Sequence, residues 1–298
     1  MYINFLDWNT YDGFSEGSGT SSQQWIVSKN GDRIGLFKFP KSLDTTDHIS
    51  EKIASNIAKI IGIPCADIDL GIYRDKYDCN KIKNGMISYK INPDGVNLIE
   101  GVSLISSKYT NYDSEELKDT ETGECYSLHM IMNSLKSYKL DKEFLKMIIF
   151  DYLIGNSDRH DRNWAILRKD GDIKLSPLYD NASSLCAYEN EDTLEKCLGK
   201  DTNKFKALVD TKSRTLIRID KFNLGKKGPK HSEMIEYINK NYYADTINFV
   251  KHVKNVLTEE VIDNIIDQYS KYLSINKCKV LKKYLKEKIR RLLNIYNI

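Results

Sequence analysis

Residues Ile149–Leu167, with the sequence IFDYLIGNSDRHDRNWAIL, decide how the chain folds around its most polar segment. The apolar first part is typical of a helix that begins near Asp141 and stops at Gly155. Trp164–Leu167 is short and apolar, as expected for a strand. Seven of the eight residues 156–163 between these elements are charged, His or Asn. A loop this polar between core-forming elements is costly without partners, so it is the first candidate for a functional site.

A second apolar segment, Ile173–Leu175, follows a turn and leads into Ser176–Asp180. The two strands predict a hairpin whose ends bring Asp158, Asn163 and Asp180 within reach of one another. One carboxylate can orient a hydroxyl and accept its proton. An amide oxygen and a second carboxylate suit a Mg²⁺ ion that bridges phosphate oxygens. The pattern therefore favours phosphoryl transfer, which needs positioning and charge neutralisation above all.

The N-terminal part of the chain predicts strands and one helix. Gln24–Ser28 and Arg33–Phe39 are β-prone, and Asn30-Gly31 between them tolerates the positive φ of a hairpin turn. Asp44–Ile61 carries isoleucines at helical spacing and stops at a glycine. Two further strands are expected, over Ala66–Tyr73 and Met86–Ile91.

The remainder of the chain predicts mainly helices. Residues 105–140 look polar and irregular, and the chain is expected to be helical from about residue 243 to its end. A small sheet followed by helices is an α+β arrangement. We expect a β-rich part over residues 1–92 and a helical part over residues 93–298.

The polar loop also carries a family resemblance. Asp158 and Asn163 are five residues apart, as in the Asp-x-x-x-x-Asn part of the protein-kinase catalytic loop, and Asp180 follows the next hairpin. The strings Gly155–Asn163 and Ser176–Asp180 resemble the HipA-like serine/threonine kinase family, which carries Gly-Asn-x-Asp-Arg-His-x-x-Asn and Pro-Leu-Tyr-Asp in this order. The resemblance implies a bilobal protein-kinase-like fold with a small β-rich N-lobe and a larger helical C-lobe.

The resemblance implies a role for each matching residue. Asp158 would be the catalytic base, and Asn163 and Asp180 would bind Mg²⁺. Lys38 would contact the phosphates of ATP from its strand. Glu51, in the following helix, would form an ion pair with Lys38.

The resemblance also places the nucleotide. The loop from residue 17 to residue 22 would lie over it, with contacts from Gly17, Ser18 and Gly19. Ser88–Ile91 would be the adenine-facing hinge, with Tyr89 and Ile91 at the nucleotide. In the family a serine of the phosphate loop can be autophosphorylated, which switches the enzyme off. The candidates in this chain are Ser18, Ser21 and Ser22.

The chain departs from larger family members, which carry a long extra segment before the phosphate loop. Here the loop arrives by residue 17, so the chain resembles compact members that lack the extra N-terminal subdomain. Whether a small antitoxin-like partner supplies that part stays open. The resemblance implies a protein substrate, with an aminoacyl-tRNA synthetase or another translation factor as one class to consider.

The bulk composition is that of an ordinary globular protein. Hydrophobic residues make up 41% and charged residues 29%, and the formal charge of +3 does not by itself imply a nucleic-acid or membrane partner. The six cysteines form no C-x-x-C pair, so reduced thiols in a cytosol are expected. No apolar stretch approaches a membrane span, and no secretory signal is visible. We therefore expect a cytoplasmic location, while secretion by a route without such a signal stays open.

The last helix carries a basic run. Its apolar residues keep helical spacing, so a solvated outer face is favoured over a nucleic-acid or membrane surface. The basic residues are Lys277, Lys279, Lys282, Lys283, Lys286, Lys288, Arg290 and Arg291.

Several alternatives stay open at this point. The same motifs fit a kinase of small molecules or lipids, a nucleotidyl transferase, or a catalytically weak or dead kinase fold that binds a partner in a toxin–antitoxin-type complex. A metal hydrolase site on His160 and Asp161 is disfavoured, because no second histidine lies at ligand spacing. His160 and Arg159 are expected to brace the loop.

Overall fold

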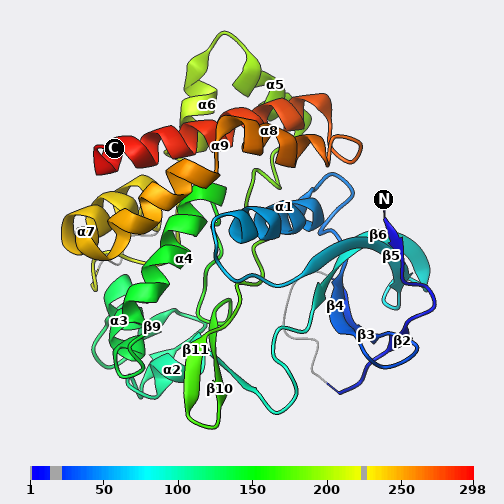
Figure 1. Cartoon of the computed structure of the whole chain (residues 1–298), viewed down its shortest axis with the longest axis horizontal. Coiled ribbons are helices and arrows are strands. Elements are labelled where there is room, and N and C mark those ends of the chain that lie inside the picture. The colour runs from blue at the N-terminus through cyan, green and yellow to red at the C-terminus, as the bar shows by residue number, and fades with distance from the viewer. Residues whose placement is uncertain (1, 14–21, 223–226) are drawn as a thin grey trace.

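The N-terminal part of the chain forms a six-stranded sheet (Figure 1). The structure is a computed structural model that describes residues 2–13, 22–222 and 227–298. The strand order is β1-β5-β6-β4-β3-β2, with β1 parallel to β5 and the other neighbours antiparallel. The strands are β1 (Ile3–Asn4), β2 (Asn9–Thr10), β3 (Gln23–Val27), β4 (Ile34–Lys38), β5 (Ile68–Asp75) and β6 (Lys81–Tyr89).

Strand β4 shows why this sheet forms and how it orients Lys38. Side chains alternate across a strand, and Phe37 is fully buried while Lys38 is only half-buried on the other face. Phe37 packs with Phe39 and Tyr73 in a small core of its own, on one side of the sheet. The predicted alternation of β4 is thus confirmed, and it leaves the Lys38 ammonium on the face away from that core.

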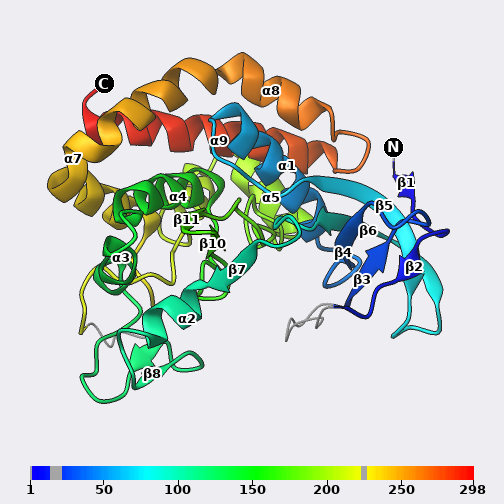
Figure 2. The same cartoon turned by 60° about the horizontal axis from the view of Figure 1, so that its bottom comes forward.

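Helix α1 (Asp47–Ile60) lies between the sheet and the C-terminal helices (Figures 1 and 2). It contacts β5 and β6 on one side and α8 on another. Its buried isoleucines, Ile49, Ile53 and Ile57, are the stripe that the sequence predicts. They join the main core, which continues through the helical part.

Beyond β6 the chain forms a three-stranded sheet, of order β11-β10-β7, and a group of helices around α4. Helix α4 packs against α3, α7 and α9. Among the helices of the described ranges, none combines the length and apolarity that a membrane crossing requires. The elements are β7 (Asn97–Glu100), α2 (Gly101–Ser106), β8 (Tyr112–Asp113), β9 (Lys118–Asp119), α3 (Leu128–Lys136), α4 (Asp141–Ile154), β10 (Ala165–Lys169), β11 (Asp172–Leu175), α5 (Glu191–Leu198), α6 (Thr202–Val209), α7 (His231–Val256), α8 (Glu259–Asp267) and α9 (Ile275–Tyr296).

The expectation that residues 105–140 are irregular is wrong. They contain the buried helix α3, whose cap is Ser127: its hydroxyl accepts a hydrogen bond from the Met130 amide at 3.1 Å. Helices α5 and α6, which begin at similar caps, Asn190 and Asp201, were not predicted either. Short helices of this kind depend on a single capping group and on tertiary contacts, so their apolar periodicity is weak.

Candidate active site

The polar loop, residues 156–163, begins where Gly155 ends helix α4. Gly155 has φ +69°, and a Cβ at this position would lie 2.1 Å from the Tyr284 hydroxyl. Glycine is therefore required both by the left-handed conformation and by the close approach of α9. The Asn156 amide then donates to the Asp151 carbonyl at 2.9 Å, which closes the helix and starts the loop.

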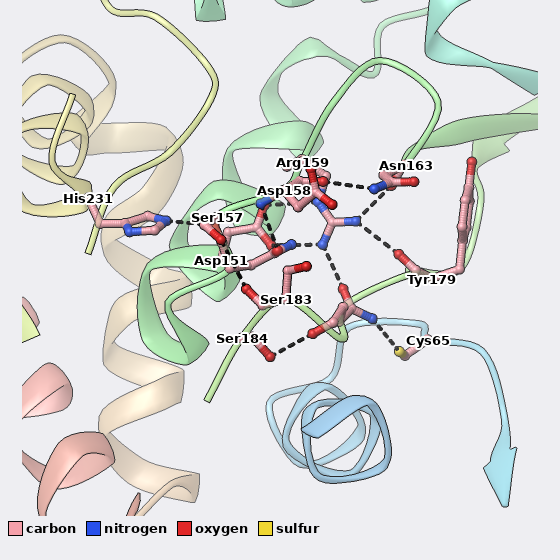
Figure 3. Close-up of polar contacts among 12 residues, drawn as sticks. Cys65, Asp151, Ser157, Asp158, Arg159, Asn163, Tyr179, Ser183, Ser184 and His231 are labelled. Atoms are coloured by element: carbon pink, nitrogen blue, oxygen red, sulfur yellow. Dashed lines mark hydrogen bonds and ion pairs between the residues drawn. The ribbon is translucent and has the colours of Figure 1, made fainter. Parts of the chain in front are cut away.

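Arg159 holds the polar loop together from the inside (Figure 3). Its guanidinium forms an ion pair with Asp151 of α4, with Nη2 2.7 Å from Oδ1. It also donates to the carbonyls of Asn163, at 2.7 Å, and Tyr179, at 3.0 Å, and to Oδ1 of Asn181, at 2.6 Å. One buried side chain thus ties the loop to the segment after β11, and the predicted bracing role of Arg159 has a direct structural basis.

Asn163 and Asp158 are joined across the loop. Asn163 Nδ2 donates to the Asp158 carbonyl at 2.7 Å, and the Asp158 amide donates to Asn156 Oδ1 at 3.1 Å. This arrangement leaves Asn163 Oδ1 without a protein partner in the part of the chain that the structure describes. Burial raises the pKa of the Asp158 carboxyl; the nearby His160 opposes this rise and the charge of Asp180 adds to it. The charges of the Asp158 and Asp180 carboxylates therefore interact across the loop.

Asp180 lies against Lys38 from the N-terminal sheet. Its Oδ1 is 3.0 Å from the Lys38 ammonium, and the Asp180 side chain is 38% exposed. The backbone of Asp180 has φ +55°, a conformation uncommon for non-glycine residues and found preferentially at functional sites. Burial would raise the pKa of Asp180, but the Lys38 charge and hydrogen bond outweigh it and lower that pKa. Asp180 is thus a carboxylate held ionised.

The predicted ion pair between Lys38 and Glu51 is not formed in this structure. Lys38 pairs with Asp180, and the buried Glu51 accepts a hydrogen bond from Asn181 Nδ2 at 3.2 Å instead. Glu51 Oε2 is buried without a partner among the described residues. Burial, and then the charge of Asp180, raise the pKa of Glu51 to about 7. Two carboxylates compete for one ammonium, and in this structure Lys38 contacts Asp180 directly and not Glu51.

The other predicted nucleotide contacts are placed only in part. Gly17, Ser18, Gly19 and Ser21 lie outside the described residues. Ser22 is described, and its hydroxyl donates to Asp75 Oδ1 at 2.7 Å.

The predicted hinge, Ser88–Ile91, spans the end of β6. Tyr89 is held by a hydrogen bond from its hydroxyl to Asp69 Oδ2, at 2.9 Å, and its ring lies under the Arg33 guanidinium. The Tyr89 side chain therefore supports the sheet through its own contacts and is not free to move. Among the described residues, the backbone amide of Ile91 donates no hydrogen bond, so it remains able to donate one.

The residues around Asp180 fit a Mg²⁺ ion. Mg²⁺ commonly takes one or two protein oxygens and completes its shell with water and substrate phosphates. Asn163 Oδ1 and the Asp180 carboxylate are hard oxygen donors of this kind. Among the described residues, no three or more His, Cys, Asp or Glu side chains are grouped as a metal site.

Two residues of the site were missed from the sequence. Asp151 and Asn181 are the buried partners of Arg159, and Asn181 also reaches Glu51. The signal for Asp151 was available, because it is the lone charged residue within the otherwise apolar stretch 147–154. Asn181 carried no such signal beyond its place next to Asp180.

A sheet-rich N-terminal part, a helical C-terminal part and a polar loop followed by a hairpin and Asp180 define the kinase-like fold class. The crystal structure of the Helicobacter pylori proinflammatory kinase CtkA has the same fold, with a TM-score of 0.79 over 99% of this chain and 97% of that chain, at 18% identity. The chain belongs to the HipA-like C-terminal domain family, which matches residues 15–246.

Sequence relatives agree with this assignment. The serine/threonine-protein kinase CtkA of Helicobacter pylori is 27% identical over 189 residues, which are 57% of this chain and 54% of CtkA. The putative kinase Y4dM of Sinorhizobium fredii is 42% identical over 52 residues, 17% of this chain and 13% of Y4dM. The chain thus spans about half of the first relative and a small part of the second. At the level of the family, these similarities support a kinase-type enzyme.

A toxin–antitoxin protein shares the fold. The Shewanella oneidensis HipA structure, solved with HipB and operator DNA, gives a TM-score of 0.57 over 97% of this chain and 68% of that chain, at 14% identity. This similarity concerns the fold alone.

Proposed function

We propose that the chain is an ATP-dependent serine/threonine protein kinase that uses Mg²⁺. The observation that carries the proposal is the position of Arg159, which binds both the Asn163 and the Tyr179 carbonyls. These bonds fix the polar loop beside Asp180, and the charges of Asp158 and Asp180 interact, which supports a site built from a base, an amide oxygen and an ionised carboxylate. Phosphoryl transfer requires this kind of positioning.

The residues divide the work of the reaction. Asp158 orients the acceptor hydroxyl and takes its proton as the new oxygen–phosphorus bond forms. The bond from the γ-phosphorus to the bridging oxygen breaks, and ADP leaves. Lys38 neutralises phosphate charge, with the Ile91 amide as a hydrogen-bond donor to the adenine. A Mg²⁺ ion held by Asn163 and Asp180 would supply further charge neutralisation.

We also propose autophosphorylation in the loop before β3. Ser22 donates to Asp75, which Lys83 contacts at 2.8 Å, so a phosphate on Ser22 would lie beside a buried carboxylate. Like-charge repulsion disfavours this site. Ser18 and Ser21 are therefore the favoured acceptors. The fold shared with HipA motivates one further proposal, a small antitoxin-like protein partner.

Mass spectrometry after incubation with Mg²⁺ and ATP tests the function. The proposal predicts an added phosphate on a serine or threonine of this chain or of a protein substrate, absent with Asp158→Asn. An added AMP would instead indicate nucleotidyl transfer. Phosphate appearing only on small molecules or lipids would contradict the protein-kinase assignment, and tight partner binding without ATP turnover would favour a binding module.

A further inference from the structure

A buried chain of polar groups links the last helix to the polar loop. His231, the first residue of α7, is 1% exposed, and its Nε2 lies 2.9 Å from the Asn156 carbonyl oxygen. Its Nδ1 lies 3.0 Å from Ser213 Oγ. Lys288 of α9, also 1% exposed, donates to Ser213 Oγ at 2.7 Å. Figure 3 shows the His231 ring directed from α7 toward the polar loop.

For a neutral His231 ring, the donor and acceptor of each hydrogen bond in this polar network are fixed. A carbonyl only accepts, so Nε2 of His231 carries the proton that it donates to Asn156. Nδ1 of that neutral ring must accept, so the Ser213 hydroxyl donates to it. The Ser213 oxygen is then free to accept from the Lys288 ammonium. Burial, and then the charge of Lys288, lower the pKa of His231 to about 3, which agrees with a neutral ring.

His231 completes the set of bonds that hold Asn156. The Asn156 amide donates to the Asp151 carbonyl at 2.9 Å, and its Nδ2 donates to Asp151 Oδ1 at 3.0 Å. Its Oδ1 accepts from the Asp158 amide at 3.1 Å. The carbonyl is the remaining polar group, and the imidazole holds it. Without that bond the Asn156 peptide can rotate. The Asp158 backbone, whose amide donates to Asn156 Oδ1, is then no longer held in one position.

We propose that His231 is a positioning residue for Asp158, acting through Asn156, and that Ser213 and Lys288 hold its ring in the donating tautomer. Asp158 as the catalytic base rests on the proposed function; the ordering of the polar loop by His231 does not. His231 does not touch the reacting atoms. A misplacement of the base costs about 10- to 100-fold in rate, which sets the size of the expected effect.

The test uses the full chain and compares His231→Met with His231→Gln. Methionine fills the space without a donor, whereas the glutamine amide can donate to the Asn156 carbonyl. The matched control is Tyr296→Phe, which removes a buried 2.8 Å hydrogen bond to Thr246 between the same two helices. Hydrogen exchange of peptides from residues 156–163 reports on the loop without reference to activity. Phosphoryl-transfer kinetics with ATP report on the base.

His231→Met is expected to speed exchange in the polar loop and to lower kcat about 10- to 100-fold, with little change in the KM for ATP. His231→Gln should recover most of both properties, and the control should change neither. If His231→Met does not fold, Ser213→Ala frees the ring to change tautomer and should speed loop exchange as well. Unchanged exchange in the folded variants, or equal damage by Met and Gln, would overturn the proposal. Faster loop exchange in His231→Met, found together with a wild-type protein that transfers no phosphate, would contradict the proposed function and leave the positioning role standing.

Discussion

Arg159 and Asp151 form a two-point ion pair in the interior of the protein, with Nε 2.9 Å from Oδ2 and Nη2 2.7 Å from Oδ1. Their side chains are 0% and 3% exposed. Burial would lower the pKa of Arg159, but the Asp151 charge and hydrogen bonds raise it above its usual range. The pair therefore stays charged and fixes the polar loop to helix α4.

Removing the arginine should be severe for stability. Arg159→Met leaves Asp151 as a buried charge without its partner, and we expect the free energy of unfolding in urea to fall by about 3–5 kcal/mol. The double variant with Asp151→Leu should recover a large part of this loss, because no lone charge remains. Arg168→Met, at an exposed position of β10, is the control and should change stability by no more than about 0.5 kcal/mol. A loss below about 1 kcal/mol for Arg159→Met would contradict the anchoring role.

Asp158→Asn should separate chemistry from binding. The amide cannot accept the hydroxyl proton, so we expect the rate of phosphoryl transfer to fall about 10²- to 10⁴-fold. Binding of ATP with Mg²⁺, measured by calorimetry, should stay close to wild type, because Lys38 and Asp180 are intact. Asp172→Asn, an exposed change in β11, should leave both properties unaltered. Wild-type turnover by Asp158→Asn would remove Asp158 from the reaction.

Glu51→Gln should raise stability at alkaline pH. The folded protein holds this carboxylate buried, with one oxygen unpartnered, and its pKa is raised to about 7. Above that pH the ionised form is costly, so the neutral amide should stabilise the fold by about 1–3 kcal/mol in thermal or urea unfolding near pH 8. The gain should vanish below the pKa of an unfolded glutamate, where both states are protonated. An equal effect at all pH values would show that the Glu51 charge is not the cause.

Lys288→Met should show the opposite dependence on pH. Burial, and then the charge of Arg291, lower the pKa of Lys288 to about 7. Between about pH 7 and 10.5 the unfolded chain binds more protons than the folded one, so the lysine costs most at or below pH 7 and less as pH rises. We expect Lys288→Met to gain about 1–4 kcal/mol relative to wild type at about pH 6.5 compared with about pH 10, in urea unfolding.

Other groups near Lys288 could also make the stability depend on pH. The titratable or charged groups that act on or face it are Arg291, Asp210, Cys186, His231, Tyr152 and Tyr284. The comparison of variant and wild type at each pH cancels their own titration to first order. A stability difference that is flat from pH 6.5 to 10 would contradict the buried-charge explanation.

The sequence predicted the polar loop well because its parts are local. Asp158, Asn163 and Asp180 lie within 23 residues of one another, and the elements that flank them have strong apolar patterns. The hairpin β10–β11 and helix α4 appear close to their predicted bounds. The roles assigned to these three residues stay predictions until activity is measured.

Contacts between distant parts of the chain were harder to predict from the sequence. The pairing of Lys38 with Asp180 and the bond from Asn181 to Glu51 each join the N-terminal part to the segment after β11. Lys277 and Lys288 were expected on a solvated face of the last helix, and that expectation is wrong for both: they are buried and donate to the Cys186 carbonyl and to Ser213. Helical spacing does not show which lysine meets a polar partner from elsewhere in the fold.

A crystal structure with Mg²⁺ and a non-hydrolysable ATP analogue tests the central claim most directly. The account predicts one Mg²⁺ bound by Asn163 Oδ1 and an Asp180 oxygen, with Lys38 at the phosphates and the Asp158 carboxylate facing the γ-phosphate. A nucleotide bound elsewhere, or bound with these side chains turned away from the phosphates, would contradict it.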